Sequence, residues 1–318
     1  MRAEPTPKLE VVYHDIGLSL RSRIALWFMR MFMKPMLARM VKKDLAGIAR
    51  IQQRVYSMRC HDTAGLALEH RELGVPGHLI GKLNPGRPAI LWLHGGAFIL
   101  PAAPTMHLPF VARLSRELEA AAFVPDYRLA PMHRFPAGLD DCVTAYRSLL
   151  DAGQPAAKIV LGGDSAGGNL MFGVMQRIRS AGLPMPACAI SISPVADMTE
   201  LGAPPPEHRG LDDVLLPSGS MKRMDELYIG DWDKAHPELS PVHMDCAGLP
   251  PLMFMASENE FLVDGTILLA NRTHAAGVHT ICHVWKHVPH AFPLFEGWFP
   301  EVSKSRADLV DFVRRHLP

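Results

Sequence analysis

Short apolar runs alternate with longer segments of helical periodicity from about residue 66 to the end of the chain. We expect strands at about 66–72, 78–82, 88–94, 120–126, 158–163, 187–193, 251–257 and 278–285. We expect helices near 107–119, 137–151, 168–181, 262–276 and 302–316. This alternation predicts an α/β fold with a mostly parallel central sheet of about eight strands and helices on both faces.

Residues 1–57 follow a different pattern, which is helical and rich in methionine. Apolar positions recur at helical spacing before Pro35, and the spacing resumes after it. They are Ile24, Trp27, Phe28, Met31 and Phe32, and then Leu37, Val41, Leu45 and Ile48. The other side is basic and carries Arg21, Arg23, Arg30, Lys34, Arg39, Lys42 and Lys43. Because Arg30, Lys34 and Arg39 interrupt the apolar run, no membrane-spanning helix is predicted.

Ser165 is predicted to occupy a sharp turn between a buried strand and a helix. The apolar run 158–161 precedes residues 163–167, which read Gly-Asp-Ser-Ala-Gly. In such a turn the serine backbone is strained, so its neighbours must be small. The turn lifts the hydroxyl above the sheet edge, where the N-terminus of the next helix points at it. We therefore expect Ser165 to be a nucleophile.

A glycine loop follows the expected strand at 88–94. Residues 94–98 read His-Gly-Gly-Ala-Phe. Glycines allow the backbone to approach a reacting carbonyl, and a His-Gly-Gly loop after a central strand supplies N–H groups to an oxyanion. We expect these donors to be Gly95, Gly96 and, next to the serine, Ala166.

Three motifs occur in order along the chain: 94–98, then Asp-Tyr-Arg-Leu-Ala-Pro at 126–131, then Gly-Asp-Ser-Ala-Gly-Gly at 163–168. Ser193-Pro194, Asp197, Leu249-Pro-Pro251 and Pro289-His290-x-Phe292 are further matches. Together these motifs resemble the hormone-sensitive-lipase-like (bacterial family IV) carboxylesterases of the α/β-hydrolase fold. The resemblance covers roughly residues 65–318.

In this fold a catalytic acid and then a histidine follow the serine. Glu258, Glu260 and Asp264 all lie after the expected strand at 251–257. The family acid begins an acid-x-Leu-x-Asp signature, which the resemblance places at Glu260. Asp264 fits better in the first turn of the next helix. A register slip of two residues would instead select Glu258.

The histidine is chosen from His274, His279, His283, His287 and His290, which all lie in the last quarter of the chain. His279 and His283 share one face of the expected strand at 278–285, where we expect a solvent-facing or hydrogen-bonded pair. His287 and His290 are three residues apart, but no cysteine or carboxylate cluster accompanies them, so no metal site is predicted. His290 occupies the family's His-x-Phe position, which implies the general base.

The resemblance implies a serine carboxylesterase that cleaves short- to medium-chain esters through an acyl-enzyme and needs no metal or organic cofactor. Beyond residue 98 the chain departs from the family pattern, and two prolines stiffen the loop. Phe98, Ile99, Leu100 and Met106 are expected to line an apolar substrate pocket. Two alternatives remain: a serine hydrolase of amides, lactones or acetylated metabolites, and a non-catalytic ligand-binding protein on the same scaffold.

The resemblance also implies a division into cap and core. Residues 1–57 are expected to form N-terminal cap helices, although a basic amphipathic helix can also lie on a membrane, so peripheral contact stays open. The α/β-hydrolase core is expected at 58–200 and 236–318. Residues 201–235, with a Pro-rich run at 203–206, are expected to form a second cap segment.

The charge balance and the cysteine content limit the expected binding partners and the expected cellular location. The 33 basic and 32 acidic residues nearly balance, so nucleic acid is not an expected partner. The 5 scattered cysteines and the absence of a signal-peptide pattern favour a reducing, cytoplasmic location. A small-molecule ester is the expected ligand. The strand at 278–285 could be an edge that pairs with a second copy in a homodimer.

Overall fold

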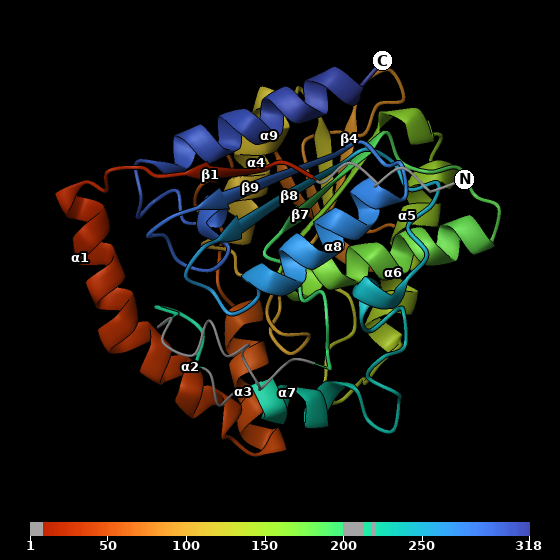
Figure 1. The fold of residues 1–318 in the computed structure, drawn as a ribbon. Coiled ribbons are helices and arrows are strands. Elements are labelled where there is room, and N and C mark those ends of the chain that lie inside the picture. The colour runs from red at the N-terminus through yellow and green to blue at the C-terminus, as the bar shows by residue number, and fades with distance from the viewer. Residues whose placement is uncertain (1–8, 200–212, 218–220) are drawn as a thin grey trace, which may run out of the picture.

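The computed structural model describes residues 9–199, 213–217 and 221–318, and within this part nine strands form one sheet (Figure 1). The strands are β1 (Val11–His14), β2 (Leu68–Glu72), β3 (Pro76–Ile80), β4 (Ala89–Leu93), β5 (Ala121–Pro125), β6 (Ile159–Asp164), β7 (Cys188–Ile192), β8 (Leu252–Ser257) and β9 (Thr280–Trp285). Their order is β1-β9-β8-β7-β6-β4-β5-β3-β2. Only the β2–β3 and β3–β5 pairs are antiparallel, so the predicted mostly parallel sheet is confirmed.

Helices cover both faces of this sheet, as predicted (Figure 1). One face packs against α4 (His107–Glu117) and α9 (Val302–His316), and the other against α5 (Ala137–Asp151), α6 (Ala166–Ser180) and α8 (Val263–Ala275). Short 3-10 turns lie at Ala156–Lys158, Pro241–His243 and Phe292–Leu294. The central strands β4 to β8 are buried along their whole length, which is why they read as continuous apolar runs.

The N-terminal strand β1 corrects two expectations. It pairs in parallel with β9, from Val11 opposite Cys282 to His14 opposite Trp285. The strand predicted at 278–285 is therefore covered by the chain's own N-terminal segment, so the proposed homodimer through an edge at 278–285 is wrong. The expectation of a helical segment over residues 1–57 is also wrong at Val11–His14, because a strand of four residues is too short to show a period.

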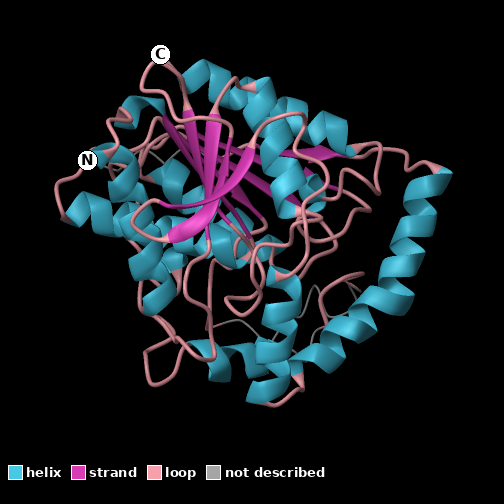
Figure 2. Cartoon of the chain, turned by 180° about the vertical axis from the view of Figure 1, so that it is seen from behind, coloured by secondary structure: helices cyan, strands magenta, loops and turns pink. Residues whose placement is uncertain are grey.

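Helices of the N-terminal segment and α7 (Met221–Tyr228) lie together beside the sheet (Figures 1 and 2). They are α1 (Leu20–Phe28), a π-helical turn (Met29–Met33), α2 (Lys34–Val41) and α3 (Leu45–Tyr56). The helix continues through Pro35 because the π turn before it accommodates the missing N–H of the proline. The cap division stays a prediction, and much of segment 201–235, including 203–206, lies outside the described residues.

Helix α1 and the π turn bury a different side from the one expected. Ala25 and Met29 pack into a cluster with Trp285 and Phe292. The predicted apolar face is exposed instead, with exposed fractions of 58% for Ile24, 57% for Trp27, 39% for Phe28, 53% for Met31 and 54% for Phe32. No described helix combines the length and the apolar character that a membrane crossing requires.

Candidate active site

Ser165 stands between β6 and α6 with backbone angles of φ 53° and ψ −118°, a conformation that few residues adopt. Its N–H donates to the Ile192 carbonyl at 2.8 Å, which ties the turn to β7. A Cβ added at Gly167 would lie 1.9 Å from the Leu93 carbonyl oxygen, and one added at Gly163 would lie 2.5 Å from the Gly167 carbonyl oxygen. Both flanking glycines are therefore required by close backbone approaches, as the motif predicted.

His290 and Glu260 form a buried pair on the loops that follow β9 and β8. Nδ1 of His290 lies 2.7 Å from Oε2 of Glu260, and their exposed fractions are 5% and 1%. Because an ionised carboxylate only accepts hydrogen bonds, Nδ1 carries the proton and Nε2 keeps its lone pair. The Ser257 N–H donates to the other carboxylate oxygen at 3.3 Å, which fixes the orientation of Glu260.

Charges around His290 favour its protonated form. Burial alone would lower the pKa of His290, but the Glu260 carboxylate and the neighbouring aspartates together raise this pKa above its ordinary 6.5. Asp213 and Asp164 add smaller contributions in the same direction. The pair can therefore accept a proton at Nε2 and hold the resulting imidazolium.

The two competing carboxylates lie elsewhere. Asp264 occupies the first turn of α8, as the sequence favoured. The N–H of Glu258 donates to the Trp285 carbonyl at 2.9 Å, which ties its backbone to β9, and its side chain is half-buried. Among Glu258, Glu260 and Asp264, the structure brings only Glu260 into hydrogen-bond contact with His290.

Asp164, next to the serine, is buried beneath the glycine loop. It accepts hydrogen bonds from Trp92 Nε1 and from the Gly95 N–H, both at 3.0 Å, and from His107 Nε2 at 3.2 Å. His107 can donate there because its Nδ1 accepts from the Ala103 N–H at 2.8 Å. Burial would raise the pKa of Asp164, but His107 and these hydrogen bonds lower it overall. Asp164 therefore braces the loop as an anion.

This contact corrects the expected set of oxyanion donors. Since the Gly95 N–H is committed to Asp164, Gly95 holds the loop in place and is not available to a substrate. Within the described residues, the N–H groups of Gly96 and Ala166 donate to no acceptor. Gly96 has φ 122°, which glycine tolerates best, and Ala166 begins α6. Gly96 and Ala166 are the donors left free from the expected three.

The expected pocket residues lie on the loop between β4 and α4. Phe98 stacks on Tyr228 of α7, with ring centroids 3.8 Å apart, and Ile99 is buried in the core. Leu100 and Met106 are half-buried. Gln52 of α3 donates to the Ile99 carbonyl at 2.7 Å. The loop is thus held between two helices of the expected cap segments, and its role as a substrate pocket stays a prediction.

The other histidines have separate surroundings. His279 is exposed, as expected, but its Nδ1 lies 2.9 Å from Nε2 of His316 and it does not pair with His283. His287 is exposed beside Asp15, whereas His290 faces Glu260, so these two do not converge on a metal. His283 is the exception: it does not face solvent with His279 but lies under β1 beside His14.

One residue near His290 carries no sequence signal. Asp213 is buried, and one of its carboxylate oxygens accepts from the N–H groups of Leu215 and Leu216 at 2.9 Å. Its other oxygen is buried and accepts from no described residue. No motif surrounds Asp213, so only the folded chain reveals its approach to His290.

Comparisons with known proteins agree on an α/β-hydrolase fold and on similarity to esterases. Residues 90–294 match a family model described as the alpha/beta hydrolase fold. An acetyl-hydrolase of Streptomyces hygroscopicus is 35% identical over 253 residues, 76% of this chain and 84% of that protein. Esterase LipU of Mycobacterium tuberculosis is 32% identical over 72% of this chain and 78% of its own. A solved esterase from the bacterial hormone-sensitive lipase family is 29% identical, has a TM-score of 0.80, and covers 95% of this chain and 100% of its own.

Proposed function

The chain belongs to the hormone-sensitive-lipase-like esterases of the α/β-hydrolase fold and is a carboxylic ester hydrolase, and from this premise we propose which residues perform the hydrolysis. Ser165 is the nucleophile, His290 the general base and Glu260 the acid that orients it. The observation that carries the proposal is the buried 2.7 Å contact between His290 Nδ1 and Glu260 Oε2. This contact leaves Nε2 able to accept the serine proton.

The reaction then proceeds in two halves. Ser165 Oγ attacks the ester carbonyl while His290 Nε2 takes its proton, and Glu260 stabilises the imidazolium. The N–H groups of Gly96 and Ala166 bind the oxyanion, and such donors contribute about 3–4 kcal/mol each to transition-state stabilisation. His290 returns the proton to the leaving alkoxide. Water, activated by the same histidine, then releases the acid from Ser165.

Short- to medium-chain esters are the proposed substrates. Phe98 and Tyr228 fill space beside the glycine loop by stacking, which supports a limited acyl site. The similarity to an acetyl-hydrolase points the same way. Apolar Ile99, Leu100 and Met106 on the same loop favour an acyl group without charge.

Covalent trapping tests the nucleophile. An alkyl fluorophosphonate forms a bond between phosphorus and the attacking serine oxygen as fluoride leaves. We expect mass spectrometry to locate one adduct on the Ser165 peptide, with much slower labelling in His290→Ala. Labelling of another residue, or full esterase activity without any labelling of Ser165, would overturn the assignment.

A further inference from the structure

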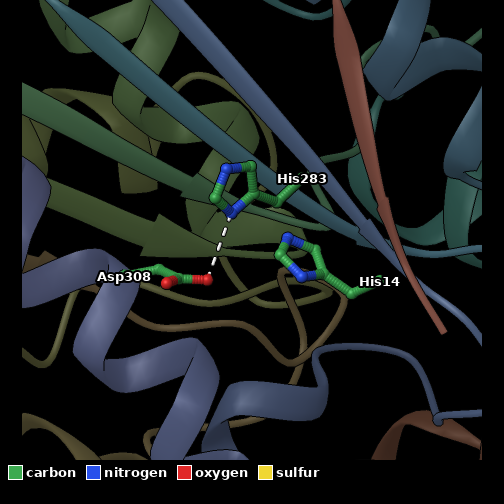
Figure 3. Close-up of side chains that lie close together, drawn as sticks. All are labelled: His14, His283 and Asp308. Atoms are coloured by element: carbon green, nitrogen blue, oxygen red, sulfur yellow. Dashed lines mark ion pairs between the residues drawn. The ribbon is translucent and has the colours of Figure 1, made fainter. Parts of the chain in front are cut away.

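Three buried polar atoms without hydrogen-bond partners converge at the seam between β1, β9 and α9. They are Nε2 of His14, Nδ1 of His283 and Oδ2 of Asp308. Figure 3 shows the three side chains turned toward one another from three different elements. Nδ1 of His283 lies 3.3 Å from Oδ2 of Asp308, and one ligand atom from each of the three residues lies within 4.8 Å of the others. Buried polar atoms are normally satisfied, so this cluster requires a partner.

The types of the three side chains indicate that the missing partner is a metal ion. Two imidazoles and one carboxylate form a ligand set of zinc and other divalent transition metals, usually with water as the fourth ligand. Donor atoms around tetrahedral Zn²⁺ lie about 3.3 Å apart, as follows from bonds of about 2.0 Å. The His283–Asp308 separation already has this value. A shift of the His14 ring toward the other two side chains would complete the set.

The surroundings of His14 suit a ligand. Its ring stacks on Trp285 with ring centroids 4.1 Å apart and an interplanar angle of 9°, which fixes its plane. Lys304 lines the adjoining cavity and opposes a cation, whereas the Asp308 carboxylate, 3.3 Å from Nδ1 of His283, attracts one.

An entry route adjoins the cluster. An open cavity of about 460 Å³ is lined by His14 and Asp308, together with Tyr13, Asp15, Ile16, Trp285, Lys304 and Ala307. Water from this cavity can supply a fourth ligand.

We propose that His14, His283 and Asp308 form a structural site for a divalent transition-metal ion, with Zn²⁺ the best match. The ion joins an N-terminal strand of only four residues to β9 and α9. Beyond His14 the chain continues into α1, and beyond β9 it continues to His290. The ion therefore fastens the N-terminal helices to the sheet and takes no part in the ester chemistry.

Metal binding by the full chain tests this site. Protein stripped with EDTA is titrated with ZnCl₂ by calorimetry and native mass spectrometry. We expect one Zn²⁺ per chain and a rise in Tm on the order of 5 °C at a hundredfold excess over Kd. His283→Gln and Asp308→Asn, which are close in shape to the native side chains, should both lose the stoichiometric ion and the Tm rise. His61→Ala, at an exposed histidine, should keep both.

A measurement on the unaltered chain guards against misfolded variants. X-ray absorption of the zinc-loaded protein should show a shell of four nitrogen and oxygen atoms, with the outer scattering of two imidazoles. Failure to bind Zn²⁺, or a loaded ion without two imidazole ligands, would overturn the proposal. So would stoichiometric binding that persists in folded His283→Gln and Asp308→Asn.

Discussion

At the scale of single residues, the chemistry depends on the protonation of His290. Its neutral form is the base, so kcat/KM should rise with pH as the imidazole loses its proton. Burial lowers the pKa of His290, but Glu260 and the neighbouring aspartates raise it overall, so the midpoint should lie above 6.5. A pH–rate profile from 5 to 9 with p-nitrophenyl butyrate measures it. A flat profile would exclude His290 as the base.

The substitution Glu260→Gln tests whether Glu260 is the catalytic acid that supports His290. The amide keeps the shape of the side chain but cannot stabilise an imidazolium, so kcat should fall on the order of 10³–10⁴. The midpoint of the pH profile should also move down, because the carboxylate no longer raises the pKa of His290. Glu258→Gln is the matched control, and its kcat should change little. The reverse result would mean that the acid is Glu258.

The sequence was enough to assign a role to some residues of the site but not to others. Ser165 is surrounded by a local motif whose glycines are required by backbone contacts, so sequence alone identifies it. The hydrogen bond from the Gly95 N–H to Asp164 could not be predicted from the sequence, because Asp164 lies 69 positions away along the chain. Asp213 has no motif at all, and its relation to His290 arises only from folding.

At the scale of elements, α1 and the π turn bury one side and expose another that is rich in large apolar residues. Met29 is 0% exposed, whereas Met31, two positions further, is 53% exposed. Met29→Ala should lower the free energy of unfolding by about 2–5 kcal/mol because it leaves a cavity. Met31→Ala should change it by about 0.5 kcal/mol or less.

Urea denaturation of both variants and the wild type measures this difference. Equal losses, or a larger loss for Met31→Ala, would mean that the exposed face is covered in solution. Peripheral membrane contact by that face stays a prediction.

The helices and strands of the core were predictable because the helical pattern extends over many residues and the strands are continuous apolar runs. The helix expected at 137–151 is α5, and the strand expected at 251–257 begins one residue later as β8. Strand β1 escaped detection because four residues carry no period. The side that α1 buries also escaped detection, since apolar residues occur around most of that helix.

At the scale of the whole molecule, the fold gathers residues that lie far apart in sequence at the carboxyl ends of parallel strands. Ser165 follows β6, Glu260 follows β8 and His290 follows β9. Ligands of open α/β sheets bind at this edge. The sequence order of the motifs was therefore enough to predict the fold. The pairing of β9 with β1 depends on a contact between the two ends of the chain, which no local pattern encodes.

Hydrolysis of p-nitrophenyl acetate, butyrate, octanoate and palmitate by the wild type and Ser165→Ala tests the central claim most directly. We expect kcat/KM to be highest for the shorter acyl chains, and kcat to fall on the order of 10⁴–10⁶ in Ser165→Ala. Ser303→Ala, at an exposed serine, is the control and should match the wild type. Turnover that survives in Ser165→Ala would contradict the proposed nucleophile, and faster turnover of palmitate than of butyrate would contradict the proposed acyl preference.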